Sequence, residues 1–215
     1  MKDKSVRKLV LIGMSNEGKT FQAERLVPQG LAHHCVDAMI ESVLDPELKA
    51  AGYAGGITDV AKWMGMPGST MYAARQTRYL ELEYIMTSRA VLAASNAEAV
   101  VDTTGSVVHL SSTVFDVLRK SAVIVYLKTR PEDVDKKFQQ YMAEPKPVVF
   151  GSIWEAPILR QTYQDALEKA YRALLQWRSL QYELLADITI DAADLRQDNV
   201  SGVGFTDLIE ALLNT

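Results

Sequence analysis

The chain has 215 residues, of which 48% are hydrophobic and 23% are charged, and its net charge at pH 7 is −4. These values are ordinary for a globular protein of one domain, and they give no reason to expect a nucleic-acid partner. The single cysteine, Cys35, excludes an internal disulfide. The first apolar run is too short for a signal peptide or a membrane span, so we expect a cytoplasmic protein without a membrane partner.

Short apolar runs alternate along the chain with longer stretches of helical periodicity. The runs that predict buried strands are residues 8–12, 34–36, 97–102, 122–128 and 187–191. The stretches that predict helices are residues 20–27, 38–51, 70–94, 111–120, 158–185 and 205–213. Residues 53–68 are expected to be mostly loop around one short helix, and the proline-rich residues 144–157 are expected to form a mobile loop.

This alternation of strands and helices predicts an α/β fold with a parallel sheet that carries helices on both faces. Ligand sites in such sheets lie at the carboxyl ends of the strands. We therefore expect residues 13–20, Asp37, residues 103–106 and residues 128–130 to lie along one edge of the sheet.

The sequence GMSNEGKT at residues 13–20 follows the first predicted strand and precedes the first predicted helix. It satisfies the phosphate-loop pattern G-x-x-x-x-G-K-[ST], in which backbone N–H groups and the helix N-terminus surround phosphate oxygens. The pattern predicts that Lys19 reaches the β- and γ-phosphates of ATP and that Thr20 binds Mg²⁺. The residues expected to bind the nucleotide are Gly13, Ser15, Asn16, Glu17, Gly18, Lys19, Thr20 and Phe21. The alternative is a strand–turn–helix junction that binds no ligand.

Asp102 ends the third predicted strand, which in this type of sheet lies beside the strand of the phosphate loop. A carboxylate at this position is typical of a residue that holds Mg²⁺ through water, so we predict that Asp102 and Thr20 form the metal site. The alternative is that Asp102 caps a turn with Thr103 or Thr104.

Several further motifs follow the phosphate loop in a characteristic order. They are CVDAMIE, ARQTRYLELE, VVDTTGSVV, VIVYLKTRPEDV and WRSLQYELLADITID. Over residues 7–191 this series resembles the shikimate kinases, a family of P-loop enzymes related to nucleoside-monophosphate kinases. Cys35 replaces the first aspartate of the family's D-x-D motif, so the chain resembles a divergent member in which the carboxylate for the metal has moved to Asp102.

The resemblance implies a three-layer α/β/α sandwich with a five-stranded parallel sheet in the order 2-3-1-4-5. It also implies that residues 1–215 form a single kinase domain, with substrate-binding helices at about 38–94 and a lid at about 139–157.

The same resemblance assigns roles to individual residues. Asp37 matches the catalytic base and substrate anchor, and Arg78 and Arg178 match two arginines that bind the substrate carboxylate. Gly105 is the one glycine that remains of the family's substrate-binding triplet, and Lys146 is the nearest match to the lid arginine. Without the resemblance, Arg78 would be read as part of a solvated charged face and Arg178 as a snorkelling side chain.

We therefore expect an ATP- and Mg²⁺-dependent kinase, with Lys19 and Asp37 as catalytic residues. It would transfer the γ-phosphate to a hydroxyl of a small carboxylated substrate, by resemblance shikimate, which would yield shikimate 3-phosphate. Two alternatives remain open. The chain is a kinase of another small molecule, such as a nucleoside, a nucleotide or a sugar acid, or it is a nucleotide-binding regulator that has lost its transfer chemistry. The sequence predicts no oligomeric state.

Overall fold

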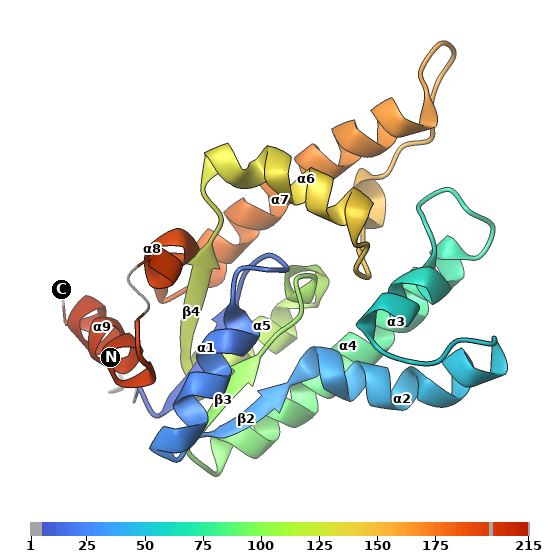
Figure 1. Cartoon of the computed structure of the whole chain (residues 1–215). Helices are drawn as coiled ribbons and strands as arrows, with labels where there is room; N and C mark the ends of the chain where they lie inside the picture. Colours follow the sequence, from blue (N-terminus) through green and yellow to red (C-terminus); the bar gives the residue numbers. More distant parts are fainter. Residues whose placement is uncertain (1–5, 198–199, 215) are drawn as a thin grey trace.

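Five parallel strands form one sheet, as the computed structural model shows for residues 6–197 and 200–214 (Figure 1). The strands are β1 (Lys8–Ile12), β2 (Ala32–Cys35), β3 (Ala99–Asp102), β4 (Val123–Lys128) and β5 (Ile188–Asp191). Their order in the sheet is β2-β3-β1-β4-β5, which confirms the predicted topology. In the register, Asp102 of β3 lies beside Leu11 of β1 on one side and beside Cys35 of β2 on the other.

Nine α-helices connect or follow the strands in the described part of the chain. They are α1 (Lys19–Leu26), α2 (Val36–Ala50), α3 (Ile57–Met64), α4 (Tyr72–Ser95), α5 (Ser112–Ser121), α6 (Val134–Ala143), α7 (Tyr163–Leu185), α8 (Ala192–Gln197) and α9 (Gly202–Leu213). Figure 1 shows α6 and α7 on one side of the loop between β1 and α1, and α2, α3 and α4 on the other.

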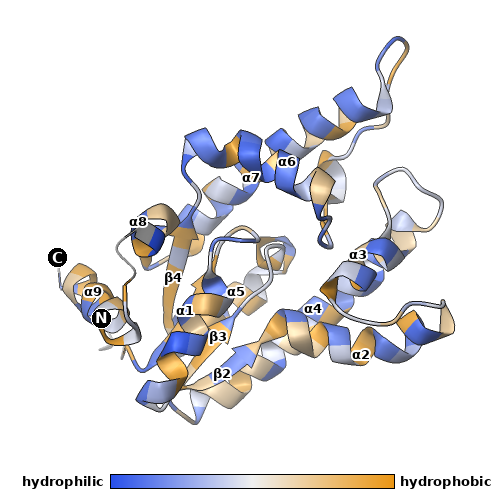
Figure 2. Ribbon diagram, in the orientation of Figure 1, coloured by the Kyte–Doolittle hydropathy of each residue, from blue (hydrophilic) through white to orange (hydrophobic). Residues whose placement is uncertain are grey.

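The sheet separates two hydrophobic cores, because successive side chains of a strand point to opposite faces. In β1, Leu9 and Leu11 pack with residues of α1 and α9, whereas Val10 and Ile12 pack with residues of α2, α4 and α7. The two cores confirm the expected three layers. Figure 2 shows that β3 and β4 are largely hydrophobic, whereas β2, with the sequence AHHC at the sheet edge, is more polar.

Local sequence explains where the long helix α7 begins. Helix α7 begins at Tyr163 and not at residue 158, because Thr162 and Asp165 form a capping box in which each side chain accepts from the other's backbone N–H. Helix α8 was not anticipated from the sequence, and α3 is the short helix within the loop-rich residues 53–68. None of the described helices combines the length and the apolar character that crossing a membrane requires.

Candidate active site

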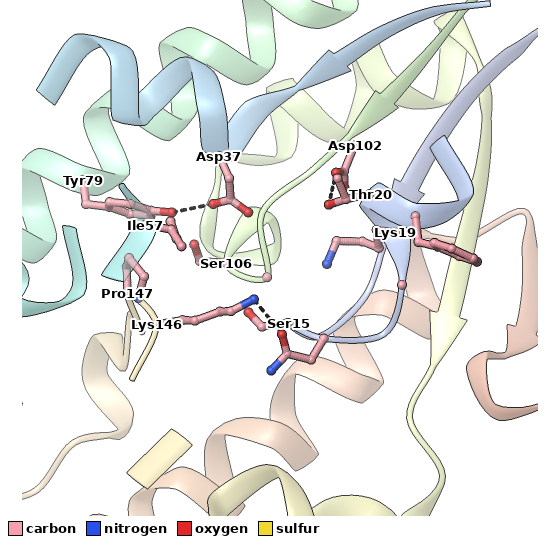
Figure 3. A pocket seen from close by; sticks show the side chains of 14 residues that line it. Ser15, Lys19, Thr20, Asp37, Ile57, Tyr79, Asp102, Ser106, Lys146 and Pro147 are labelled. Atoms are coloured by element: carbon pink, nitrogen blue, oxygen red, sulfur yellow. Dashed lines mark hydrogen bonds between the residues drawn. The ribbon is translucent and has the colours of Figure 1, made fainter. Parts of the chain in front are cut away.

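A cavity of about 270 Å³ opens at the carboxyl edge of the sheet, between the phosphate loop and helices α2 to α4 (Figure 3). Residues from separate segments line it: Ser15, Asn16, Gly18, Lys19, Thr20, Phe21, Asp37, Ile57, Tyr79, Asp102, Gly105, Ser106, Lys146 and Pro147. The cavity therefore brings together most of the side chains that the sequence singled out, although those residues are far apart along the chain.

The phosphate loop needs glycine at its first position. Gly13 has a φ of 142°, and a Cβ atom there would lie 2.5 Å from the carbonyl oxygen of Leu127 on β4. Such a contact is too close for any side chain, so Gly13 allows β1 and β4 to stay paired while the loop turns toward α1. Gly105, on the loop after β3, also faces a crowded wall, because its Cβ would lie 3.1 Å from Ser15 Oγ.

Lys19 is the buried cation of the site. Its Nζ donates to the carbonyl oxygens of Gly13 and Met14 at 2.9 Å each, and only 6% of the residue is exposed. Burial lowers the pKa of Lys19, and the carboxylates of Asp102 and Asp37 oppose this shift. The ammonium is thus held inside the loop by two neutral carbonyl oxygens. Phosphate oxygens carry negative charge and accept stronger hydrogen bonds, so a bound phosphate would replace these partners.

Thr20 and Asp102 form the second feature of the cavity. Thr20 Oγ1 donates to Asp102 Oδ2 at 2.6 Å, and Asp102 is 3% exposed. The hydroxyls of Thr103 and Thr104 donate to Leu11 O and to Glu83, and the backbone N–H of Thr103 also donates to Leu11 O, so none of these groups is bonded to Asp102. A hydroxyl and a carboxylate are hard oxygen donors that suit Mg²⁺.

Asp37 lies in the first turn of α2 and lines the same cavity. Tyr79 of α4 donates its hydroxyl proton to Asp37 Oδ1 at 3.1 Å, as Figure 3 shows. Burial raises the pKa of Asp37, whereas the nearby Lys19 ammonium and the Tyr79 hydrogen bond oppose this shift. A fixed carboxylate of this kind can orient an alcohol and accept its proton.

Glu83 is a further buried acid, which the sequence reasoning missed. It is fully buried on α4 and accepts hydrogen bonds from Ser106 Oγ at 2.7 Å and from Thr104 Oγ1. Burial raises the pKa of Glu83 to about 7, although these two hydrogen bonds oppose the shift. The signal for it was helical spacing, because Tyr79 and Glu83 are four residues apart on the apolar side of α4, where a charged residue is unusual.

We predict that Glu83→Gln removes a pH-dependent loss of stability. The folded chain holds this proton up to about pH 7, whereas the unfolded chain releases it near 4.5, so the free energy of unfolding falls as pH rises between these values. In the variant, the decrease in the free energy of unfolding over this pH range should be smaller by up to about 3 kcal/mol. Urea unfolding at pH 5 and pH 8 measures it, with Glu81→Gln on the exposed side of α4 as the control; equal pH dependence in all three proteins would contradict the prediction.

The structure does not bring Arg78 to the cavity. Its guanidinium forms an ion pair with Glu47 of α2 at 3.0 Å, lies 3.9 Å from Glu81, and its side chain is 40% exposed. Tyr79, the next residue of α4, lines the cavity. Adjacent residues of an α-helix project about 100° apart around its axis, so Arg78 points away from the cavity. Arg78 belongs instead to a solvated charged face, the alternative reading of the sequence.

Arg178 is close to the cavity but lies behind its wall. It is 4% exposed, donates through Nη2 to Val149 O at 2.8 Å, and lies 3.4 Å from His109 Nε2. Its Nη1 is 3.6 Å from the place that a Cβ of Gly105 would occupy. Burial and the Arg178 charge lower the pKa of His109 to about 3, so the imidazole is neutral. Arg178 therefore does not snorkel into solvent.

The segment after α6 covers the phosphate loop. Lys146 Nζ donates to Asn16 Oδ1 at 2.6 Å, and Pro147 lines the cavity beside it. Hydrogen bonds tie this segment to α4, because Tyr72 donates to Val148 O at 2.8 Å and Phe150 N donates to Gln76 Oε1 at 2.9 Å. The lid predicted at about residues 139–157 overlaps the end of α6, because this helix continues to Ala143.

Two predicted nucleotide-binding side chains contact charged residues outside the cavity lining. Glu17 is 2% exposed and forms ion pairs with Lys137 at 2.6 Å and with Arg196 of α8 at 3.0 Å. Phe21 lines the cavity. The Arg25 guanidinium packs over the Phe21 ring, with its central carbon 4.2 Å from the ring centre. Glu17 thus fixes the outer side of the phosphate loop.

The chain matches no protein-family model and no curated protein sequence. Solved structures do match. The shikimate kinase from Acinetobacter baumannii, in complex with shikimate, is 21% identical over 88% of both chains, with a TM-score of 0.56. The Bacteroides thetaiotaomicron shikimate kinase is 17% identical over 96% of this chain and 98% of that one, with a TM-score of 0.57. The Aquifex aeolicus shikimate kinase is 14% identical over 96% and 95%, with a TM-score of 0.50. The chain therefore has the P-loop α/β fold of the shikimate kinases.

Proposed function

We propose that this protein is an ATP-dependent kinase that transfers the γ-phosphate to a hydroxyl group of a small molecule. The observation that carries the proposal is that Lys19, Asp37 and the Thr20–Asp102 pair face one cavity beside the phosphate loop. Phosphoryl transfer needs positioning and charge stabilisation more than covalent chemistry, and these groups supply both.

Each residue has a defined task in this proposal. Lys19 and the loop N–H groups bind the β- and γ-phosphates, and Asp37 orients the acceptor hydroxyl and accepts its proton at a carboxylate oxygen. Thr20 and Asp102 would hold Mg²⁺, which when bound neutralises phosphate charge. Lys146 and Pro147 cover the loop and exclude water from the site.

We predict that Asp102→Asn raises the Mg²⁺ concentration needed for half-maximal turnover by about tenfold or more, because an amide lacks the negative charge that attracts the ion. A Mg²⁺ titration of ADP release measures this effect. Asp116→Asn, an exposed change on α5, is the matched control. An unchanged Mg²⁺ dependence in Asp102→Asn would contradict the assignment.

Two classes of acceptor fit the site for different reasons. The fold and the position of Arg178 beside Gly105 favour shikimate or another carboxylated alcohol. The cavity lining favours an uncharged alcohol, because no arginine is among the described residues that line it, and Tyr79 and Ser106 offer hydroxyl groups there. An enclosed carboxylate needs a cationic partner, and the two lysines that line the cavity are assigned elsewhere, Lys19 to the phosphates and Lys146 to Asn16.

A panel of acceptors tests the function. ADP release is measured with shikimate, with uncharged polyols, with sugar acids and with nucleosides, and the product is identified by mass spectrometry. The strongest stimulation by shikimate would establish a shikimate kinase, whereas stimulation by a polyol would establish the second class. Binding of Mg·ATP without any acceptor-stimulated turnover would indicate a regulator, and no binding in calorimetry would refute the proposal.

Arg178→Lys separates the two acceptor classes. If the acceptor is a carboxylate that reaches Arg178, the loss of the planar fork should raise its KM by about tenfold or more with a smaller effect on kcat. Arg78→Lys is the matched control on the exposed face of α4 and should leave KM unchanged. An unchanged KM in folded Arg178→Lys would favour an uncharged acceptor.

A further inference from the structure

Three side chains of different chemistry meet at the carboxyl ends of β2 and β3. His33 and Cys35 are two residues apart on β2, so both point to the same face of the sheet. Asp102 lies beside Cys35 in the parallel register and therefore points to this face as well. The topology thus places a nitrogen, a sulfur and an oxygen donor together at the edge of the sheet.

The distances make this group compact. One ligand atom from each of His33, Cys35 and Asp102 lies within 4.8 Å of the other two. His33 Nε2 is 3.8 Å from Asp102 Oδ2, outside hydrogen-bond range, and the side chains are only 16% and 4% exposed. Among the described residues, the buried His33 Nε2 has no hydrogen-bond partner. A buried imidazole nitrogen without a partner is unfavourable, and a bound cation would supply what it lacks.

We propose that His33, Cys35 and Asp102 bind a divalent transition-metal ion of the Zn²⁺ type. Imidazole, thiolate and carboxylate are the ligands that Zn²⁺ prefers, whereas Mg²⁺ requires oxygen ligands. Ligands around tetrahedral zinc stand about 3.3–3.8 Å apart, so small side-chain rotations would close the site. Binding replaces the proton of the Cys35 thiol, which passes to solvent, and leaves a coordination position open to water.

This site shares one carboxylate with the proposed magnesium site. Asp102 Oδ2 accepts the Thr20 hydrogen bond and is also the oxygen that lies 3.8 Å from His33 Nε2. A transition metal that engages Asp102 competes with Thr20 for the same oxygen. We therefore expect Zn²⁺ to inhibit Mg²⁺-dependent turnover. This consequence rests on the proposed function, whereas binding of the metal does not.

Titration of the full chain with Co²⁺ in the absence of nucleotide tests the site. Co²⁺ adopts the zinc geometry and gives a near-ultraviolet absorption band only when a thiolate is a ligand. The wild type and His34→Asn should show this band, saturating at one ion per chain; His34 neighbours the site in sequence but points to the opposite face. Cys35→Ser should lose the band, and His33→Asn should bind about tenfold more weakly or worse.

Folding and alternative sites are controlled separately. Thermal unfolding without metal should be similar in all four proteins, and Zn²⁺ should raise the Tm of the wild type but not that of Cys35→Ser. Co²⁺ binding without a thiolate band would assign the ion to the oxygen site and overturn the proposal. Equal affinity in all variants, or no binding by the folded wild type, would also overturn it. If the protein proved to have no kinase activity, the Co²⁺ band would still be expected. A failure of the proposed function can therefore be distinguished from a failure of the proposed metal site.

Discussion

Asp37→Asn is expected to lower kcat by about a hundredfold or more while nucleotide affinity stays within about twofold. The amide keeps the shape of the side chain but cannot accept the acceptor proton, and Asp37 lies on α2 rather than on the phosphate loop. Initial rates of acceptor-dependent ADP release give kcat, and calorimetry with Mg·ATP gives the affinity. Glu41→Gln, one turn further along α2, is the matched control and should leave both quantities unchanged.

The pH profile adds a second signature of the same residue. Activity should fall on the acid side as Asp37 takes up a proton, and burial moves this limb above the pH range of an ordinary aspartate. The Tyr79 hydrogen bond lowers the pKa of Asp37, so Tyr79→Phe should shift the acid limb to higher pH. An acid limb that Tyr79→Phe does not move, or full activity in Asp37→Asn, would remove Asp37 from the chemistry.

Lys19→Met is expected to reduce kcat by about a hundredfold or more and also to weaken nucleotide binding. The ammonium is a buried positive charge within the phosphate loop, where it already donates to Gly13 O and Met14 O. Methionine retains much of the length of the side chain but has no charge and no donor. Single-turnover ADP formation separates the chemical step from binding, which calorimetry measures.

Lys62→Met is the matched control for this variant. Lys62 lies on α3 with a side chain that is 57% exposed, and its ion pair with Asp59 is a surface interaction of small energy. Both variants should be compared by urea unfolding, since Lys19→Met removes a buried positive charge that interacts with the carboxylates of Asp37 and Asp102. A folded Lys19→Met protein with kcat near that of the wild type would refute the proposed role of the loop.

Local patterns explain how much of the fold was predictable. Strands β1, β3 and β4 are continuous apolar runs because both of their faces are buried, and such runs are visible without any tertiary information. Helix α8 is short and follows β5 directly, so it carries too few residues for a periodic pattern. The apolar periodicity predicts too early a start for helix α7, because the capping box of Thr162 and Asp165 sets the first helical residue at Tyr163.

The sequence by itself determined the phosphate loop and the alternation of strands and helices, since both depend on neighbouring residues and on regular spacing. Only the tertiary structure decided which side chains face the cavity. The rotation of α4 presents Tyr79 to the cavity and leaves Arg78 exposed, and the packing of α7 places Arg178 behind Gly105. Lys146 reaches Asn16 across 130 positions of the chain. Such contacts depend on helix rotation and strand register, which a short segment does not specify because they are set by packing against the rest of the molecule.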